Sequence, residues 1–76
     1  MGNMKSKKEY DQLIGKALRS ARKRKRMSQD TLAQLLRIDR STISKYETGD
    51  NPIDMSTFMQ ICDVMGLDAN QVLEDL

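Results

Sequence analysis

The stretch that decides the fold covers residues 29–49 and reads QDTLAQLLRIDRSTISKYETG. Ser28 stands directly before it, and a serine side chain there accepts a hydrogen bond from the free N–H groups of a helix start. Apolar residues then recur at helical spacing until residues 37–39 break the pattern, and the last of these, an aspartate, is a good N-cap. We therefore predict helices over residues 28–36 and 40–47, joined by a three-residue turn.

The segment before this stretch predicts another helix. Over residues 10–24 the apolar side chains recur at spacings of three and four, the pattern of an amphipathic helix. Gly15 interrupts this helix and weakens it by about 1 kcal/mol. The apolar positions are Tyr10, Ile14, Ala17, Leu18 and Ala21.

The segment after the stretch predicts two more helices. One follows from near Asp54 to Met65, where Gly66 stops it, and Asp68 caps a short last helix that runs to Leu76. The chain has no internal repeat and no strand-like alternation of useful length. The predicted fold class is all-α, with five helices packed round one core. The apolar set of the fourth helix is Met55, Phe58, Met59, Ile61, Cys62 and Met65.

The length of 76 residues allows one domain, near the lower size limit for a fold held by a hydrophobic core alone. Residues 1–8 are polar, carry lysines and lack periodicity, so we expect a flexible basic N-terminal arm there. Residues 9–76 are then the single folded domain. Within it, Ile43 and Tyr46 share one face of their helix and are expected in the core.

Charge is unevenly distributed, although the net charge is only +2. Residues 1–26 carry ten lysines and arginines against two acids, whereas residues 50–76 carry six acids and neither lysine nor arginine. Such a dipolar molecule has one face suited to polyanions. Only three aromatic residues are present, too few for stacking platforms that bind single strands, so duplex nucleic acid is the better fit.

Several classes of protein are disfavoured by what the sequence lacks. With no histidine and one cysteine, Cys62, it offers no zinc finger and no internal disulfide. It has no nucleophile beside a base, no Gly-rich phosphate loop and no paired carboxylates, so we expect no enzyme, no catalytic residue and no cofactor. No apolar run reaches the roughly 18 residues of a membrane helix. We expect a cytoplasmic protein without a membrane partner, a metal site or an evident small-molecule ligand.

Three segments together resemble the helix-turn-helix family of lambda repressor and Cro, also called XRE-type regulators. They are MSQDTLAQLL, IDRSTISKYETGDNPI and MQICDVMGLDANQVL, and the resemblance spans residues 14–73. It implies a five-helix domain whose third helix enters the major groove of DNA. It also implies a transcriptional regulator of the phage-repressor, restriction-controller or similar type, acting as a homodimer on a pseudo-palindromic operator.

The third helix carries the residues expected to read bases. By type and spacing, Arg40, Ser41 and Lys45 suit directed hydrogen bonds to base edges, with Arg40 the first choice for guanine. The resemblance places the same three at base-contacting positions, with Ser44 assisting, and implies phosphate contacts for Ser28, Gln29 and Thr42. A solvated helix face is the alternative for the five residues of the third helix, Arg40, Ser41, Thr42, Ser44 and Lys45.

The basic run RKRKR at residues 22–26 has two interpretations. Arg22 and Arg24 contact phosphates, or the run is a solvated helix end whose cations complement the helix dipole. The resemblance gives Arg22 a separate role, an ion pair with Glu47 that ties the first helix to the end of the third. We treat this pair as exposed, with a contribution of only about 0–1 kcal/mol.

The turn between the two central helices departs from the family pattern. Arg37 stands where the family often has glycine, and an arginine in a left-handed conformation costs about 1–2 kcal/mol. Either the residue adopts that conformation or the turn takes another backbone path.

Two other functions remain to be weighed against DNA binding. An antitoxin or a bridging protein of the same fold would act mainly through protein–protein interaction. A basic amphipathic first helix would also suit a membrane surface, but its apolar face is needed to close the core.

Overall fold

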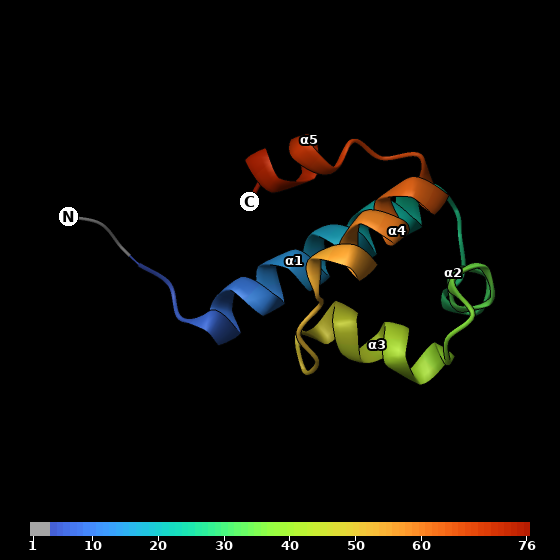
Figure 1. Cartoon of the computed structure of the whole chain (residues 1–76), viewed down its shortest axis with the longest axis horizontal. Coiled ribbons are helices and arrows are strands. Elements are labelled where there is room, and N and C mark those ends of the chain that lie inside the picture. Colours follow the sequence, from blue (N-terminus) through green and yellow to red (C-terminus); the bar gives the residue numbers. More distant parts are fainter. Residues whose placement is uncertain (1–3) are drawn as a thin grey trace.

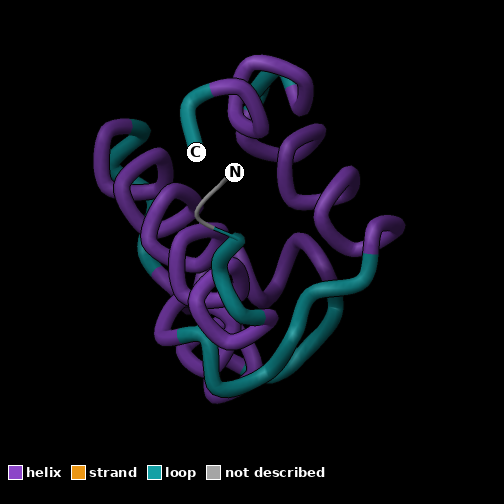
Figure 2. Tube along the Cα trace, turned by 90° about the vertical axis from the view of Figure 1, so that its left-hand side faces the viewer, coloured by secondary structure: helices purple, strands orange, loops and turns teal. Residues whose placement is uncertain are grey.

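The structure, a computed structural model, describes residues 4–76 and shows five helices (Figure 1). Within this range there is no strand, and loops join the helices directly (Figure 2). The all-α class and the five helices predicted from the sequence are confirmed. No helix in the described part is long and apolar enough to cross a membrane. The helices are α1 (Lys7–Arg24), α2 (Gln29–Leu36), α3 (Arg40–Thr48), α4 (Met55–Met65) and α5 (Ala69–Glu74).

Helix α1 begins three residues earlier than its apolar pattern indicates. Ser6 is the N-cap, and its side chain accepts from the Glu9 N–H at 3.1 Å, while the Ser6 N–H donates to the Glu9 carboxylate at 3.0 Å. This reciprocal capping box makes Lys7 and Lys8 part of the first turn rather than of an arm. The hydrogen bond from the Ser6 N–H is the largest cause that lowers the pKa of Glu9. Residues 1–3 of the predicted arm lie outside the described residues.

Helices α1, α2 and α4 end in the same backbone turn. In each, a residue with positive φ follows the helix, and the next N–H returns to a carbonyl oxygen five residues back at 2.8–3.0 Å. Arg37 has φ 58°, so of the two alternatives for the turn the left-handed one is confirmed. Arg26, with φ 55°, closes α1 in the same way, and only the third position is a glycine, Gly66.

The core lies where α1, α2, α3 and α4 meet. Ile43 is almost fully buried and Tyr46 packs against the buried cluster, as expected. Three apolar residues that we placed on inward-facing stripes are instead exposed: Tyr10, Met55 and Met59. Their helices bury narrower stripes than predicted, because only one side of each helix faces its neighbours. The buried cluster consists of Leu18, Ala21, Leu32, Ala33, Ile43, Phe58, Ile61, Cys62 and Met65.

Gly15 allows α1 to approach the end of α3 closely (Figure 1). A Cβ atom at this position would lie 2.6 Å from the Glu47 carbonyl oxygen and closer still to that of Tyr46. The sequence indicated only a weakened helix here. The structure shows instead that the missing side chain lets two backbones touch.

Replacing Gly15 by alanine should lower the free energy of unfolding by about 1–3 kcal/mol, because the added methyl group must push α1 away from α3. In an ordinary helix interior the same change stabilises by about 1 kcal/mol, so the sign is diagnostic. Chemical denaturation measures the difference, and Ser20→Ala, at an exposed position of α1, is the matched control. A Gly15→Ala protein as stable as the wild type would contradict the close approach.

Replacing Arg37 by glycine should raise the free energy of unfolding by about 1 kcal/mol, since glycine adopts the left-handed conformation without a Cβ clash. Thermal denaturation of the purified protein gives the comparison. Arg37→Ala removes the same charge but keeps the Cβ atom, and it should bring no gain. Equal stabilisation by both substitutions would mean that charge, and not backbone conformation, is the cause.

Candidate nucleic-acid interface

A buried ion pair holds the end of α3 against α1. The Arg22 Nε donates to Glu47 Oε2 at 2.6 Å and its Nη2 donates to Glu47 Oε1 at 3.0 Å. The side chains of Arg22 and Glu47 are 9% and 4% exposed. The pairing implied by the family resemblance is therefore confirmed, but its predicted exposure is wrong. Removing one partner of a buried bidentate pair costs more stability than removing one partner of a surface pair.

Two further contacts complete the network around this pair. The Arg22 Nη1 donates to the Met27 carbonyl oxygen at 2.8 Å, and the Gln29 side-chain amide donates to Glu47 Oε1 at 3.0 Å. Within residues 4–76, no buried side-chain nitrogen or oxygen lacks a hydrogen-bond partner. One carboxylate thus joins α1, α2 and α3, and the guanidinium of Arg22 is enclosed. Arg22 is not placed to contact phosphate, and we reassign it to a structural role.

The start of α2 carries backbone N–H groups that no carbonyl of the same helix can pair with. The Ser28 side chain caps the helix by accepting from the Thr31 N–H at 3.0 Å. The first N–H groups of a helix have no partner within it, and those of Gln29 and Asp30 come first here. The Gln29 side-chain amide is already hydrogen-bonded to Glu47. The phosphate contact expected of Gln29 would therefore be made by its backbone N–H.

The residues expected to read bases lie on the outer side of α3. Arg40, Ser41 and Lys45 are exposed, and Thr42 and Ser44 are half-buried. Ile43 and Glu47 of the same helix are buried and fix its orientation. The side chains that face outward are therefore free to contact a ligand, while the helix that carries them is held in place.

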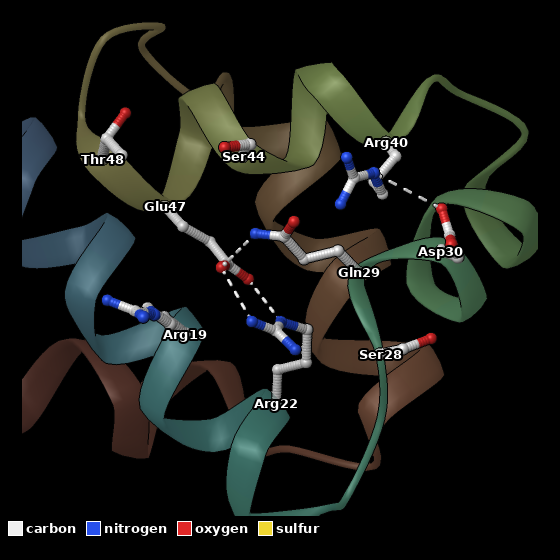
Figure 3. A pocket seen from close by; sticks show the side chains of 9 residues that line it. All are labelled: Arg19, Arg22, Ser28, Gln29, Asp30, Arg40, Ser44, Glu47 and Thr48. Carbon is white, nitrogen blue, oxygen red and sulfur yellow. Dashed lines mark hydrogen bonds and ion pairs between the residues drawn. The ribbon is translucent and has the colours of Figure 1, made fainter.

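An open groove of about 510 Å³ lies between α1, the start of α2 and one side of α3. Figure 3 shows its lining, with the Glu47 network at the centre and Arg40 at the rim beside Asp30. Of the predicted site residues, the groove brings together Ser28, Gln29, Arg40, Ser44 and the buried Arg22. The lining is completed by Arg19, Asp30, Glu47 and Thr48.

Arg19 lines this groove but was not among the predicted contact residues. It is exposed and lies on the face of α1 that also carries Gly15 and Arg22. Its spacing of four from the glycine and three from the buried arginine placed it on that face, so the sequence contained the signal.

Four predicted contact residues do not line the groove. Ser41, Thr42 and Lys45 lie farther round or along α3, and Arg24 is an exposed residue of the last turn of α1. These residues extend the polar surface on either side of the groove. Within the described residues no group of three acidic or cysteine side chains is placed to hold a metal ion.

Comparisons with known proteins agree with this geometry. Residues 18–72 match the helix-turn-helix family HTH_3. The clp gene regulator ClgR from Corynebacterium glutamicum superposes with a TM-score of 0.80 at 27% identity, covering 83% of this chain and 82% of that one. The restriction-modification controller protein C.AhdI from Aeromonas hydrophila superposes with a TM-score of 0.78 at 25% identity, covering 84% and 97%. No curated protein sequence matches the chain.

Replacing Glu47 by alanine should lower the free energy of unfolding by about 3–5 kcal/mol, because it leaves the Arg22 guanidinium buried without its partner. Lys7→Ala is the control, since it breaks an exposed pair with Asp11 whose expected contribution is below about 0.5 kcal/mol. Urea denaturation of the two variants gives both values. Similar losses for both would show that burial adds nothing to the Arg22–Glu47 pair.

Proposed function

The chain belongs to the helix-turn-helix family HTH_3 and is a DNA-binding transcriptional regulator, and we propose that it reads its operator by inserting α3 into the major groove. In this proposal Arg40, Ser41 and Lys45 contact base edges and Ser44 assists them. Ser28, Gln29, Thr42 and Arg24 contact phosphates and fix the register, and Arg19 joins them.

The observation that carries the proposal is the contrast between the two sides of α3. Its inner side is immobilised by Ile43 and by the buried Arg22–Glu47 pair, and its outer side is polar and exposed. A helix that reads bases needs both properties, because hydrogen bonds to base edges discriminate only when their donors are held in register. The nearby basic residues of α1 and the free N–H groups of α2 supply the attraction for phosphate.

We also propose that the protein acts as a homodimer on a pseudo-palindromic operator. Two recognition helices about 34 Å apart would read half-sites on one face of the duplex. Leu73 and Leu76 on and after α5, and Met55 and Met59 on α4, are apolar side chains 38–61% exposed. A second copy is the simplest partner to cover them.

As a regulator of DNA, the protein would work in the cytoplasm, where its one buried thiol stays reduced.

The second candidate function is a protein of the same fold that acts mainly by binding another protein, as an antitoxin or bridging factor does. The same exposed apolar residues of α4 and α5 favour it. It differs from our main proposal in one respect that experiment can separate. Its DNA affinity would be weak, insensitive to sequence or absent.

Selection of bound sites from random duplex DNA tests specificity, symmetry and half-site spacing together. We expect a pseudo-palindrome, and binding that weakens steeply as the salt concentration rises. Arg40→Ala should cost about 1–3 kcal/mol on the selected site and relax preference at one base position in each half-site. Arg24→Ala should weaken all sequences alike, which makes it the matched control.

Binding that is absent or insensitive to salt would remove the operator proposal and favour the protein–protein alternative. Losses that are equal and blind to sequence in Arg40→Ala and Arg24→Ala would remove the assignment of Arg40 to a base.

A further inference from the structure

One acid stands at the rim of the groove that we propose faces DNA. Two acids line this groove, but Glu47 is buried and paired with Arg22, whereas the Asp30 side chain is 72% exposed. A free carboxylate beside a phosphate backbone repels it, so Asp30 works against binding to any DNA sequence. Affinity for DNA therefore does not account for an acid at this position.

Asp30 has one charged partner, the Arg40 side chain on the neighbouring helix. The distance from Arg40 Nε to Asp30 Oδ1 is 3.6 Å, which is an ion pair and longer than a hydrogen bond. The Arg40 side chain is 64% exposed, so the pair contributes little to the stability of the free protein. At a surface from which DNA excludes water, the same two charges attract each other more strongly.

The atoms that form this pair leave the other end of the guanidinium free. Asp30 engages Arg40 through Nε, and Figure 3 shows the two terminal nitrogens on the side away from the carboxylate. A guanidinium is a planar fork, so a carboxylate beside Nε favours orientations in which the two terminal groups point away from it. Those two groups are the ones that pair with O6 and N7 of guanine.

We propose that Asp30 is a positioning residue that sets the base specificity of Arg40. It holds the guanidinium by Nε, presents both terminal nitrogens to guanine and keeps the side chain from swinging to a nearby phosphate. The inference rests on the proposed function, because it requires Arg40 to contact a base. A carboxylate at this place lowers affinity for DNA in general and raises preference for guanine at one position.

The test uses the full chain and four duplexes that differ only at the base pair whose preference Arg40→Ala relaxes. Binding constants are measured for the wild type, Asp30→Asn, Arg40→Ala and the double variant. In Asp30→Asn, preference for guanine should fall by about threefold or more, a part of the 5- to 150-fold that a bidentate arginine–guanine contact provides. Affinity for unrelated DNA should rise by about twofold or more, since one repulsive charge is removed.

The double variant separates positioning from simple repulsion. Without the Arg40 side chain, Asp30→Asn should still raise affinity for all DNA but should no longer change base preference. Asp63→Asn, which removes the same charge from an exposed position of α4 outside the groove, is the matched control and should leave base preference unchanged. Circular dichroism of each variant verifies that the helices are retained.

The outcomes distinguish this inference from the function on which it rests. If the wild type prefers guanine through Arg40 but Asp30→Asn keeps that preference, the positioning role is wrong and the operator proposal stands. If Asp30→Asn changes preference equally in the presence and absence of Arg40, Asp30 acts on DNA directly and the positioning role is again wrong. If the wild type shows no sequence preference, the proposed function itself fails.

Discussion

The arrangement of α1, α2 and α3 depends on the buried contact between Arg22 and Glu47. Its two hydrogen bonds at 2.6 and 3.0 Å define both the distance and the rotation of α3 relative to α1. Gln29 shares the same carboxylate, so α2 is fixed by the same group. Because a lone buried charge is costly, the three helices are stable only in the one arrangement in which every partner is present.

Gly15 acts on the same junction from the backbone side. The carbonyl groups at the end of α3 lie directly against its Cα atom, so α1 and α3 meet without an intervening side chain. The charged network joins the side chains of the two helices, whereas contact between their backbones sets a lower limit on the separation of the helices. Together the two contacts hold α3 at its C-terminal end, which leaves its N-terminal end, with Arg40, at the molecular surface.

The helices could be predicted from the sequence because their signals are local. Ser28 and Gly66 mark helix ends, and the predicted bounds agree with the structure within a few residues. Burial could not be predicted so well, because it depends on which neighbour a helix face meets. Met55 and Met59 are exposed for this reason, and the Arg22–Glu47 pair is buried although both residues read as surface residues.

In the candidate site too, local features could be predicted from the sequence, whereas contacts between helices could not. Residue type and position on a helix sufficed to place Arg40, Ser41 and Lys45 outward, and the structure finds them exposed. The groove beside them joins three helices, so the pairing of Asp30 with Arg40 needed the tertiary arrangement. The separation of an exposed outer face of α3 from a buried inner one also has an evolutionary consequence. If the outer face of α3 reads bases as we propose, substitutions there redirect such a protein to new genes with little loss of stability, and its targets diverge faster than its fold.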